Sequence, residues 1–129
     1  MTTVLVVDDD ELVGEMMRAV LERAGMRVIL HHSGFGLAIA VREHRPDLVV
    51  LDVNMPGLSG IHAVRAMRAL DPSYGIDAPV LLHSGMAGEA LEELAREIGA
   101  AGCLRKPARA AETVAAVRRA LEPKVAVGS

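Results

Sequence analysis

Aromatic side chains are scarce in this sequence, which has one Phe, one Tyr and no Trp among its 129 residues. A stacking platform for single-stranded nucleic acid needs such side chains, so we do not expect one here. An excess of basic charge is also missing, because 14 Lys and Arg face 17 Asp and Glu and the net charge is −3. Without a basic field to hold a phosphate backbone, we predict no direct nucleic-acid binding.

Cysteine is almost absent as well. The single Cys103 has no partner for an internal disulfide, which fits a reducing compartment. The first ten residues, MTTVLVVDDD, have no basic segment, and their apolar run is too short for a signal peptide or a membrane span. These absences predict a cytoplasmic protein without a membrane partner.

Apolar residues, by contrast, are sufficient for a core, since 51% of the chain is hydrophobic and 24% is charged. Strand patterns and helix patterns alternate along it. We predict strands over residues 3–7, 26–31, 47–52, 79–84 and 102–106, and helices over residues 11–25, 33–44, 60–70, 88–99 and 110–121. We assign residues 1–122 to one domain and residues 123–129 to a C-terminal tail.

The alternation of strands and helices predicts an α/β fold. Near-continuous apolar strands such as VLVV and LVVL are typical of a parallel sheet that helices cover on both faces. Together these patterns predict five βα units, (βα)5, in a doubly wound three-layer sandwich. In open sheets of this kind, ligands bind outside the carboxyl ends of the strands, where the strand order reverses.

Polar side chains follow four of the predicted strands at the point where each strand ends. They are three carboxylates, a hydroxyl and an amine: Asp8, Asp9, Asp52, Ser84 and Lys106. Because the carboxyl ends of parallel strands lie on one edge of a sheet, we expect these groups to converge. Crowded carboxylates repel one another, and Mg²⁺ relieves the repulsion by taking oxygen ligands. Since a lysine suits a phosphate oxygen, the set predicts phosphoryl chemistry with an aspartate acceptor.

Four segments of the chain, LVVDDDE, PDLVVLDVNMPGLSG, VLLHSG and GCLRKPA, resemble the receiver domain of two-component response regulators, of the kind found in chemotaxis. The resemblance covers residues 3 to about 121. It implies a flavodoxin-like fold with a parallel five-stranded sheet in the order 2-1-3-4-5. It also implies a phosphoprotein of phosphorelay signal transduction. Such a protein catalyses its own phosphorylation and dephosphorylation but is a switch, not an enzyme in the usual sense.

The resemblance assigns a metal site to the acidic residues. Asp52 matches the phosphoacceptor. Asp8 and Asp9 match the acidic pair that, together with Asp52, holds Mg²⁺ or Mn²⁺. Asn54 matches the position whose backbone carbonyl completes that site.

The resemblance also assigns the groups that contact the phosphoryl group. Ser84 matches the Ser or Thr that hydrogen-bonds it, and Lys106 matches the lysine that bonds the acyl phosphate. The Lys106–Pro107 peptide matches one that is often cis in the family.

The partners that the resemblance implies are proteins. A histidine kinase or a histidine phosphotransfer protein would supply the phosphoryl group to Asp52. A downstream protein would bind the face made by helix 88–99, strand 102–106 and helix 110–121, and a phosphorylation-dependent homodimer through that face stays open.

The sequence departs from the receiver pattern at Cys103. Three residues before the lysine, receivers usually carry Tyr or Phe, and this aromatic side chain moves together with the Ser or Thr of the switch. A thiol is too small to act in the same way. The phosphorylation chemistry does not need the aromatic ring, but the resemblance does not extend to the coupling between Ser84 and the partner surface.

Two alternative functions remain open at this point. One is a degenerate receiver that binds partners without phosphate, for which Cys103 is the single favourable feature. The other is a phosphatase similar to the haloacid dehalogenases, in which Asp8 is the nucleophile and Asp10 the general acid of a D-x-D motif. The second alternative leaves Asp52 unexplained, and the chain lacks room for the usual cap insertion.

Local patterns give further expectations. Ser33 is a candidate N-cap for the second helix, and the helical spacing of Met16 and Met17 predicts that both are core residues.

The histidines are expected to lie apart from the acidic residues. His31 and His32 end the second strand and have no Cys or carboxylate at ligand spacing, so we interpret them as surface residues. His83 is expected to point away from the site because neighbouring strand residues alternate in direction.

Overall fold

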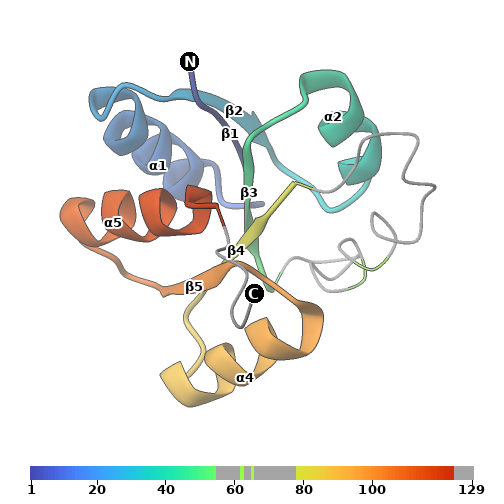
Figure 1. The fold of residues 1–129 in the computed structure, drawn as a ribbon, viewed down its shortest axis with the longest axis vertical. Coiled ribbons are helices and arrows are strands. Elements are labelled where there is room, and N and C mark those ends of the chain that lie inside the picture. Colours follow the sequence, from blue (N-terminus) through green and yellow to red (C-terminus); the bar gives the residue numbers. More distant parts are fainter. Residues whose placement is uncertain (55–61, 63–64, 66–77, 124–129) are drawn as a thin grey trace.

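A computed structural model describes residues 1–54, 62, 65 and 78–123 of the chain. Its centre is a five-stranded parallel sheet in the order β2-β1-β3-β4-β5, as the resemblance implied (Figure 1). The strands are β1 (Thr3–Val7), β2 (Arg27–His31), β3 (Leu48–Asp52), β4 (Val80–Ser84) and β5 (Gly102–Arg105).

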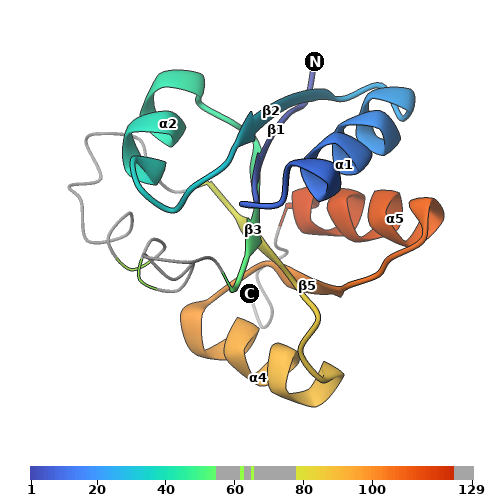
Figure 2. The same ribbon diagram turned by 180° about the vertical axis from the view of Figure 1, so that it is seen from behind.

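The described helices form two layers, one on each side of the sheet. They are α1 (Glu11–Arg23), α2 (Leu37–His44), α4 (Gly88–Ile98) and α5 (Ala110–Leu121). Helices α1 and α5 lie side by side on one face, and α2 and α4 lie on the other (Figures 1 and 2). The predicted three-layer α/β sandwich is therefore confirmed.

Two apolar clusters, one for each face of the sheet, form the core. Val4 and Val6 of β1 pack with α1 and α5, whereas Leu5 and Val7 pack with α2 and α4. Successive strand residues point to opposite faces, so a strand covered on both sides must be apolar at every position. This explains the uninterrupted VLVV run.

The strand order places the site. From β1 the chain goes outward to β2, then returns past β1 to β3 on its other side. This reversal leaves a crevice at the carboxyl ends of β1 and β3, where neither crossover covers the sheet. The aspartates that follow β1 and end β3 therefore meet at this crevice.

The boundaries of the first helix are explained by its capping residues. Asp10 precedes α1, and its side chain accepts hydrogen bonds from the backbone amides of Leu12 and Val13, at 3.0 and 3.3 Å. The helix ends at Arg23, and Gly25 follows with a φ of +89°, a conformation that glycine adopts without steric cost.

The start of the second helix was predicted wrongly. Helix α2 begins at Leu37, not at Ser33, and its N-cap is Gly36 in the left-handed conformation. The Ser33 hydroxyl instead accepts a hydrogen bond from the Phe35 amide at 3.0 Å. Serine makes such local turns as readily as helix caps, and the sequence pattern does not distinguish the two.

The expectation for Met16 was also wrong, because Met17 is buried and Met16 is 59% exposed. Consecutive helix residues point about 100° apart, so the apolar run in α1 is wider than the face that the sheet covers.

The Lys106–Pro107 peptide is cis, as expected. The helix predicted over residues 60–70 and the tail from residue 124 lie outside the described residues. In the part of the chain that the structure describes, no helix is long and apolar enough to span a membrane.

Gly14 in the middle of α1 offers a test of this packing. A Cβ at this position would meet the Leu30 side chain at 3.6 Å, an ordinary van der Waals distance. We expect Gly14→Ala to raise the free energy of unfolding by ~0.5–1 kcal/mol, because alanine favours the helix and restricts the unfolded chain. Urea unfolding measures this change. Gly25→Ala is the matched control and should destabilise the protein, since its positive φ strains any other residue; a loss of stability in Gly14→Ala would contradict the packing described.

Candidate functional site

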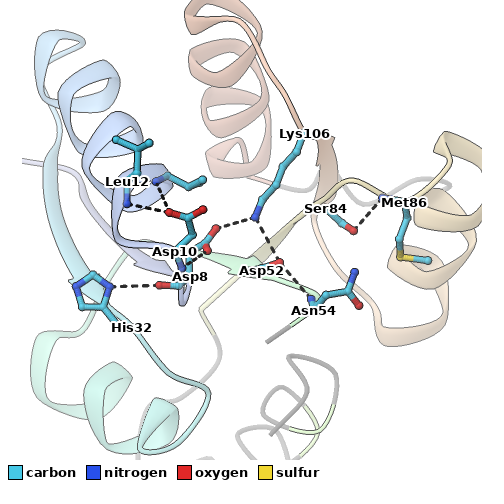
Figure 3. Close-up of polar contacts among 10 residues, drawn as sticks. Asp8, Asp10, Leu12, His32, Asp52, Asn54, Ser84, Met86 and Lys106 are labelled. Carbon is cyan, nitrogen blue, oxygen red and sulfur yellow. Dashed lines mark hydrogen bonds and ion pairs between the residues drawn. The ribbon is translucent and has the colours of Figure 1, made fainter. Parts of the chain in front are cut away.

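Three carboxylates meet at the crevice between β1 and β3. Asp8 and Asp9 follow β1, and Asp52 ends β3; each of the three offers an oxygen within 4.8 Å of those of the other two. Asp8 and Asp52 are buried, with exposed fractions of 2% and 5%, whereas Asp9 is exposed. The predicted convergence of these residues is therefore present in the structure, and Figure 3 shows Asp8 and Asp52 with the groups around them.

Backbone hydrogen bonds orient the two buried carboxylates. The Asp10 amide donates to Oδ1 of Asp8 at 2.9 Å, and the Asn54 amide donates to Oδ1 of Asp52 at 3.1 Å. In both cases the donor lies two residues after the aspartate, a local turn that aspartate favours. Asn54 is thus held beside Asp52 through its amide nitrogen; the role of its carbonyl oxygen as a metal ligand stays a prediction.

Lys106 brings the positive charge to this cluster. Its Nζ lies 2.9 Å from Oδ2 of Asp8 and 3.5 Å from Oδ1 of Asp52 (Figure 3). The lysine follows β5 and reaches across the end of β4 to both carboxylates. Two buried carboxylates therefore share one ammonium group, which leaves a net negative charge at the site.

The pKa of Asp52 reflects this imbalance. Burial raises the pKa to about 6 against an opposing hydrogen bond from Asn54, and the charge of Asp8 raises it further while that of Lys106 lowers it. Burial also lowers the pKa of Lys106, but its hydrogen bond to Asp8 and the charge of Asp52 outweigh burial, so the net pKa is raised. Lys106 is therefore a stable cation. The negative charge of ionised Asp52, by contrast, is not fully balanced by the positive charge beside it.

A hard divalent cation fits this donor set. Carboxylate oxygens are the ligands that Mg²⁺ prefers, and the three oxygens are close enough to share one ion. An added positive charge would remove the repulsion between Asp8 and Asp52 that raises the Asp52 pKa. The residues present are therefore suited to Mg²⁺ or Mn²⁺.

Ser84 ends β4 and is buried, with an exposed fraction of 1%. Its Oγ accepts a hydrogen bond from the Met86 amide at 3.1 Å, and its carbonyl oxygen accepts one from the Lys106 amide at 2.8 Å. Because Oγ accepts from Met86, the hydroxyl hydrogen is left to donate elsewhere. Ser84 can therefore supply a neutral donor near the site.

Cys103 lies on β5 beside Leu82 of β4 and packs, partly buried, against the core cluster on the α4 side. Burial, with a smaller contribution from the charge of Glu92, raises the pKa of its thiol. A raised pKa disfavours the reactive thiolate. The predicted role of a small core residue agrees with this placement, whereas its part in the switch stays a prediction.

Two histidines lie nearer to the acidic residues than expected, although His32 is exposed, as its interpretation as a surface residue predicted. His32 lies beside the acidic loop, where its Nδ1 is 3.3 Å from the backbone oxygen of Asp8. His83 pairs in register with Asp52 and is buried; burial lowers its pKa to about 4, with a further lowering by Lys106. Register neighbours project from the same face of a sheet, so His83 does not point away from the site. Register between strands was the information that the sequence lacked.

His83 makes a prediction about the pH dependence of stability. Its pKa lies below the ordinary value of 6.5, so the unfolded chain binds the proton first. The stability that neutral His83 contributes is present above pH 6.5 and is lost as the pH falls toward 4. We expect wild type to lose ~2–3 kcal/mol relative to His83→Leu over this range, as measured by urea unfolding at several pH values. A constant difference between the two proteins would show that folding does not lower the pKa of His83.

The fold is that of a flavodoxin-like α/β domain. At the carboxyl ends of its strands lie carboxylates suited to a divalent cation and a lysine suited to a phosphate group. The family model for the response regulator receiver domain matches residues 4–118. The chain therefore belongs to the response regulator receiver domain family. Receiver domains are two-component signalling proteins that interact with histidine kinases and bind Mg²⁺ at an acidic pocket, and they are not enzymes in the usual sense.

Known proteins show the same relationship. The chain is 37% identical over 118 residues to the DNA-binding response regulator MtrA of Mycobacterium tuberculosis and 38% identical to its transcriptional regulatory protein PrrA. Each match covers 92% of this chain but only 50% and 49% of the relative. The chain thus spans about half the length of these relatives, and the DNA binding named for MtrA belongs to a longer protein.

Solved structures agree with the fold. The chemotaxis protein CheY4 of Vibrio cholerae superposes with a TM-score of 0.82 at 28% identity, covering 93% of this chain and 98% of that one. A response regulator receiver domain protein of Clostridium thermocellum superposes with a TM-score of 0.79 at 27% identity, covering 94% of each chain. The family resemblance is therefore confirmed, and the phosphatase alternative built on Asp8 and Asp10 loses its basis.

Proposed function

We propose that the chain accepts a phosphoryl group on Asp52 from a histidine kinase or a histidine phosphotransfer protein, in a reaction that depends on Mg²⁺ or Mn²⁺, and acts as a switch for partner binding. Residues 1–122 form the receiver unit of this proposal, and residues 123–129 form a tail. The observation that carries it is the sharing of the Lys106 ammonium by Asp8 and Asp52 beside the exposed Asp9.

The proposed reaction is a displacement at phosphorus. An oxygen of the Asp52 carboxylate forms the new P–O bond while the bond from phosphorus to the donor's histidine nitrogen breaks, and that nitrogen keeps the electron pair. A divalent cation held by Asp8, Asp9, Asp52 and the Asn54 carbonyl would supply positive charge to the phosphoryl oxygens. Lys106 and the Ser84 hydroxyl would bond two of those oxygens, so that the protein contributes positioning and electrostatic stabilisation.

The output surface of this proposal is the face of α4, β5 and α5. Arg105 connects this face to the site, because its Nε donates to the Met86 carbonyl oxygen at 3.0 Å and the Met86 amide donates to Ser84. A change at Ser84 therefore has a covalent and hydrogen-bonded route to the surface that does not require an aromatic residue at position 103. A downstream protein, or a second copy of the receiver, would bind there.

The test is the intact mass of the protein after incubation with Mg²⁺ and acetyl phosphate. We expect wild type to gain one phosphoryl group, on Asp52. It should gain none when the cation is chelated before the reaction. Asp8→Ala should label slowly, whereas Asp10→Ser should label like wild type, because serine keeps the helix cap that Asp10 provides.

The remaining alternative gives a different result. A degenerate receiver would gain no phosphoryl group under any of these conditions, although all the matching site residues are present. Phosphate release without a label on Asp52 would also contradict the proposal.

A further inference from the structure

We propose that His32 is a positioning residue for the metal site, because it fixes the backbone of Asp8 through a hydrogen bond from Nδ1 to the Asp8 carbonyl oxygen. The inference rests on the proposed function, in which Asp8 helps to hold a divalent cation. Tandem histidines at the end of β2 have no role in the chemistry described so far, and the structure gives each of them a separate contact.

The end of β2 holds the backbone of Asp8 at both of its polar groups. The Asp8 amide donates to the carbonyl oxygen of His31 at 3.1 Å, which continues the β1–β2 ladder by one residue. The Asp8 carbonyl oxygen lies 3.3 Å from Nδ1 of His32 (Figure 3). Both contacts join residues more than twenty positions apart in the chain, so they orient the acidic loop relative to β2 rather than locally.

The chemistry of the contact sets the state of the imidazole ring. A carbonyl oxygen only accepts hydrogen bonds, so Nδ1 must carry the hydrogen. The ring lies near α1, since a Cβ built at Gly14 would be 3.9 Å from Cε1 of His32, an ordinary van der Waals distance. The contact with the Asp8 carbonyl oxygen therefore determines the tautomer of the exposed His32 ring.

The acidic loop needs such a contact because its own charges oppose the arrangement. Asp8, Asp9 and Asp52 place their oxygens within 4.8 Å of one another, and like charges at that separation repel. The side chain of Asp8 is bonded by Lys106 and by the Asp10 amide, which leaves His32 to hold the backbone oxygen. A loop held in place before the cation arrives binds it more tightly, because less ordering is required on binding.

The first test compares Mg²⁺ affinity in His32→Asn and His32→Leu by calorimetry, at a pH well above the ordinary histidine pKa of about 6.5. Nδ2 of asparagine occupies the place of Nδ1 of histidine and keeps the donor, whereas leucine removes it. We expect the Kd to rise about 3- to 10-fold in His32→Leu, the usual worth of one hydrogen bond, and to stay within about 2-fold of wild type in His32→Asn. His44→Leu, at an exposed histidine at the end of α2, is the matched control and should leave the Kd unchanged.

The second test is independent of the metal. Nitrogen-15 NMR of the metal-free protein should show His32 as the Nδ1–H tautomer in wild type. An Nε2–H tautomer, or equal Kd values in the leucine and asparagine variants, would overturn the inference. A change in urea unfolding without a change in Kd would also overturn it, since the contact would then be merely structural. If wild type itself fails to bind Mg²⁺, the proposed metal site fails, and the tautomer still decides whether the contact to Asp8 exists.

Discussion

An Asp52→Asn variant is expected to gain no phosphoryl group from any donor and yet to be more stable than wild type in the absence of a divalent cation. The amide has no nucleophilic carboxylate oxygen, so the displacement at phosphorus cannot occur. The gain in stability follows from the raised pKa of Asp52, since burial and the charge of Asp8 make its ionised form unfavourable in the folded protein.

The sign and the pH range of this effect follow from linkage. The pKa of Asp52 is about 6 in the folded protein against an ordinary 3.8, so the folded state binds the proton more tightly. The stability that protonation contributes is fully present below pH 3.8 and is lost as the pH rises through 6. The asparagine variant avoids this loss and should be ~2–3 kcal/mol more stable than wild type above pH 7, with little difference near pH 4.

Urea unfolding of both proteins at several pH values, with and without Mg²⁺, measures the effect. Mg²⁺ should stabilise wild type more than Asp52→Asn, because the variant has lost one of the three carboxylates in the cluster. Equal stability of the two proteins at every pH would contradict the electrostatic account of the site, and phosphoryl uptake by the variant would contradict the choice of Asp52 as acceptor.

A Lys106→Met variant should lose both stability and phosphoryl uptake. Methionine keeps the apolar length of the side chain but leaves Asp8 and Asp52 without the cation that lies 2.9 and 3.5 Å away. Removing one partner of a buried ion pair commonly costs 3–5 kcal/mol. Because the lysine side chain is 24% exposed, we expect a smaller loss of ~2–3 kcal/mol in metal-free protein.

In Lys106→Met, we also expect a large decrease in the rate of phosphoryl uptake, separate from the loss of stability. Nζ of Lys106 lies 3.5 Å from Oδ1 of Asp52, and removal of one such electrostatic contact commonly slows a reaction ~10²–10³-fold. The labelling rate with acetyl phosphate at saturating Mg²⁺ measures it, under conditions in which the variant is folded.

Lys106→Arg is the matched control, since it keeps the charge and changes the shape of the donor. It should retain most of the stability and only part of the labelling rate. Labelling of Lys106→Met at the wild-type rate would exclude Lys106 from the phosphoryl site, and wild-type unfolding of the metal-free variant would show that the two carboxylates are not ionised together.

Two titrations of opposite sign act on this domain between pH 4 and pH 6. Protonation of Asp52 favours the folded state as the pH falls, whereas the low pKa of His83 favours the unfolded state. The two side chains are register neighbours on β3 and β4. The wild-type protein should therefore show a flatter acid dependence of stability than either His83→Leu or Asp52→Asn.

Much of this protein could be determined from its sequence because the relevant patterns are local. Apolar runs of four residues, VLVV and LVVL, predicted the two central strands β1 and β3, since a strand covered on both faces is apolar at nearly every position. The shorter runs of β2, β4 and β5 were recognised by their alternation with helix patterns. The polar residues that follow those runs identified Asp8, Asp52 and Lys106, because the carboxyl ends of parallel strands must share one edge.

Only the tertiary structure decided which of these groups touch, since contact depends on strand order and register. Lys106 and Asp8 are 98 residues apart, and they meet because β5, β4, β3 and β1 are consecutive in the sheet. Sequence patterns carry no information on how much water or charge surrounds a side chain. Three features therefore required the folded structure. They are the exposure of Met16, the burial of His83 and the contact of His32 with Asp8.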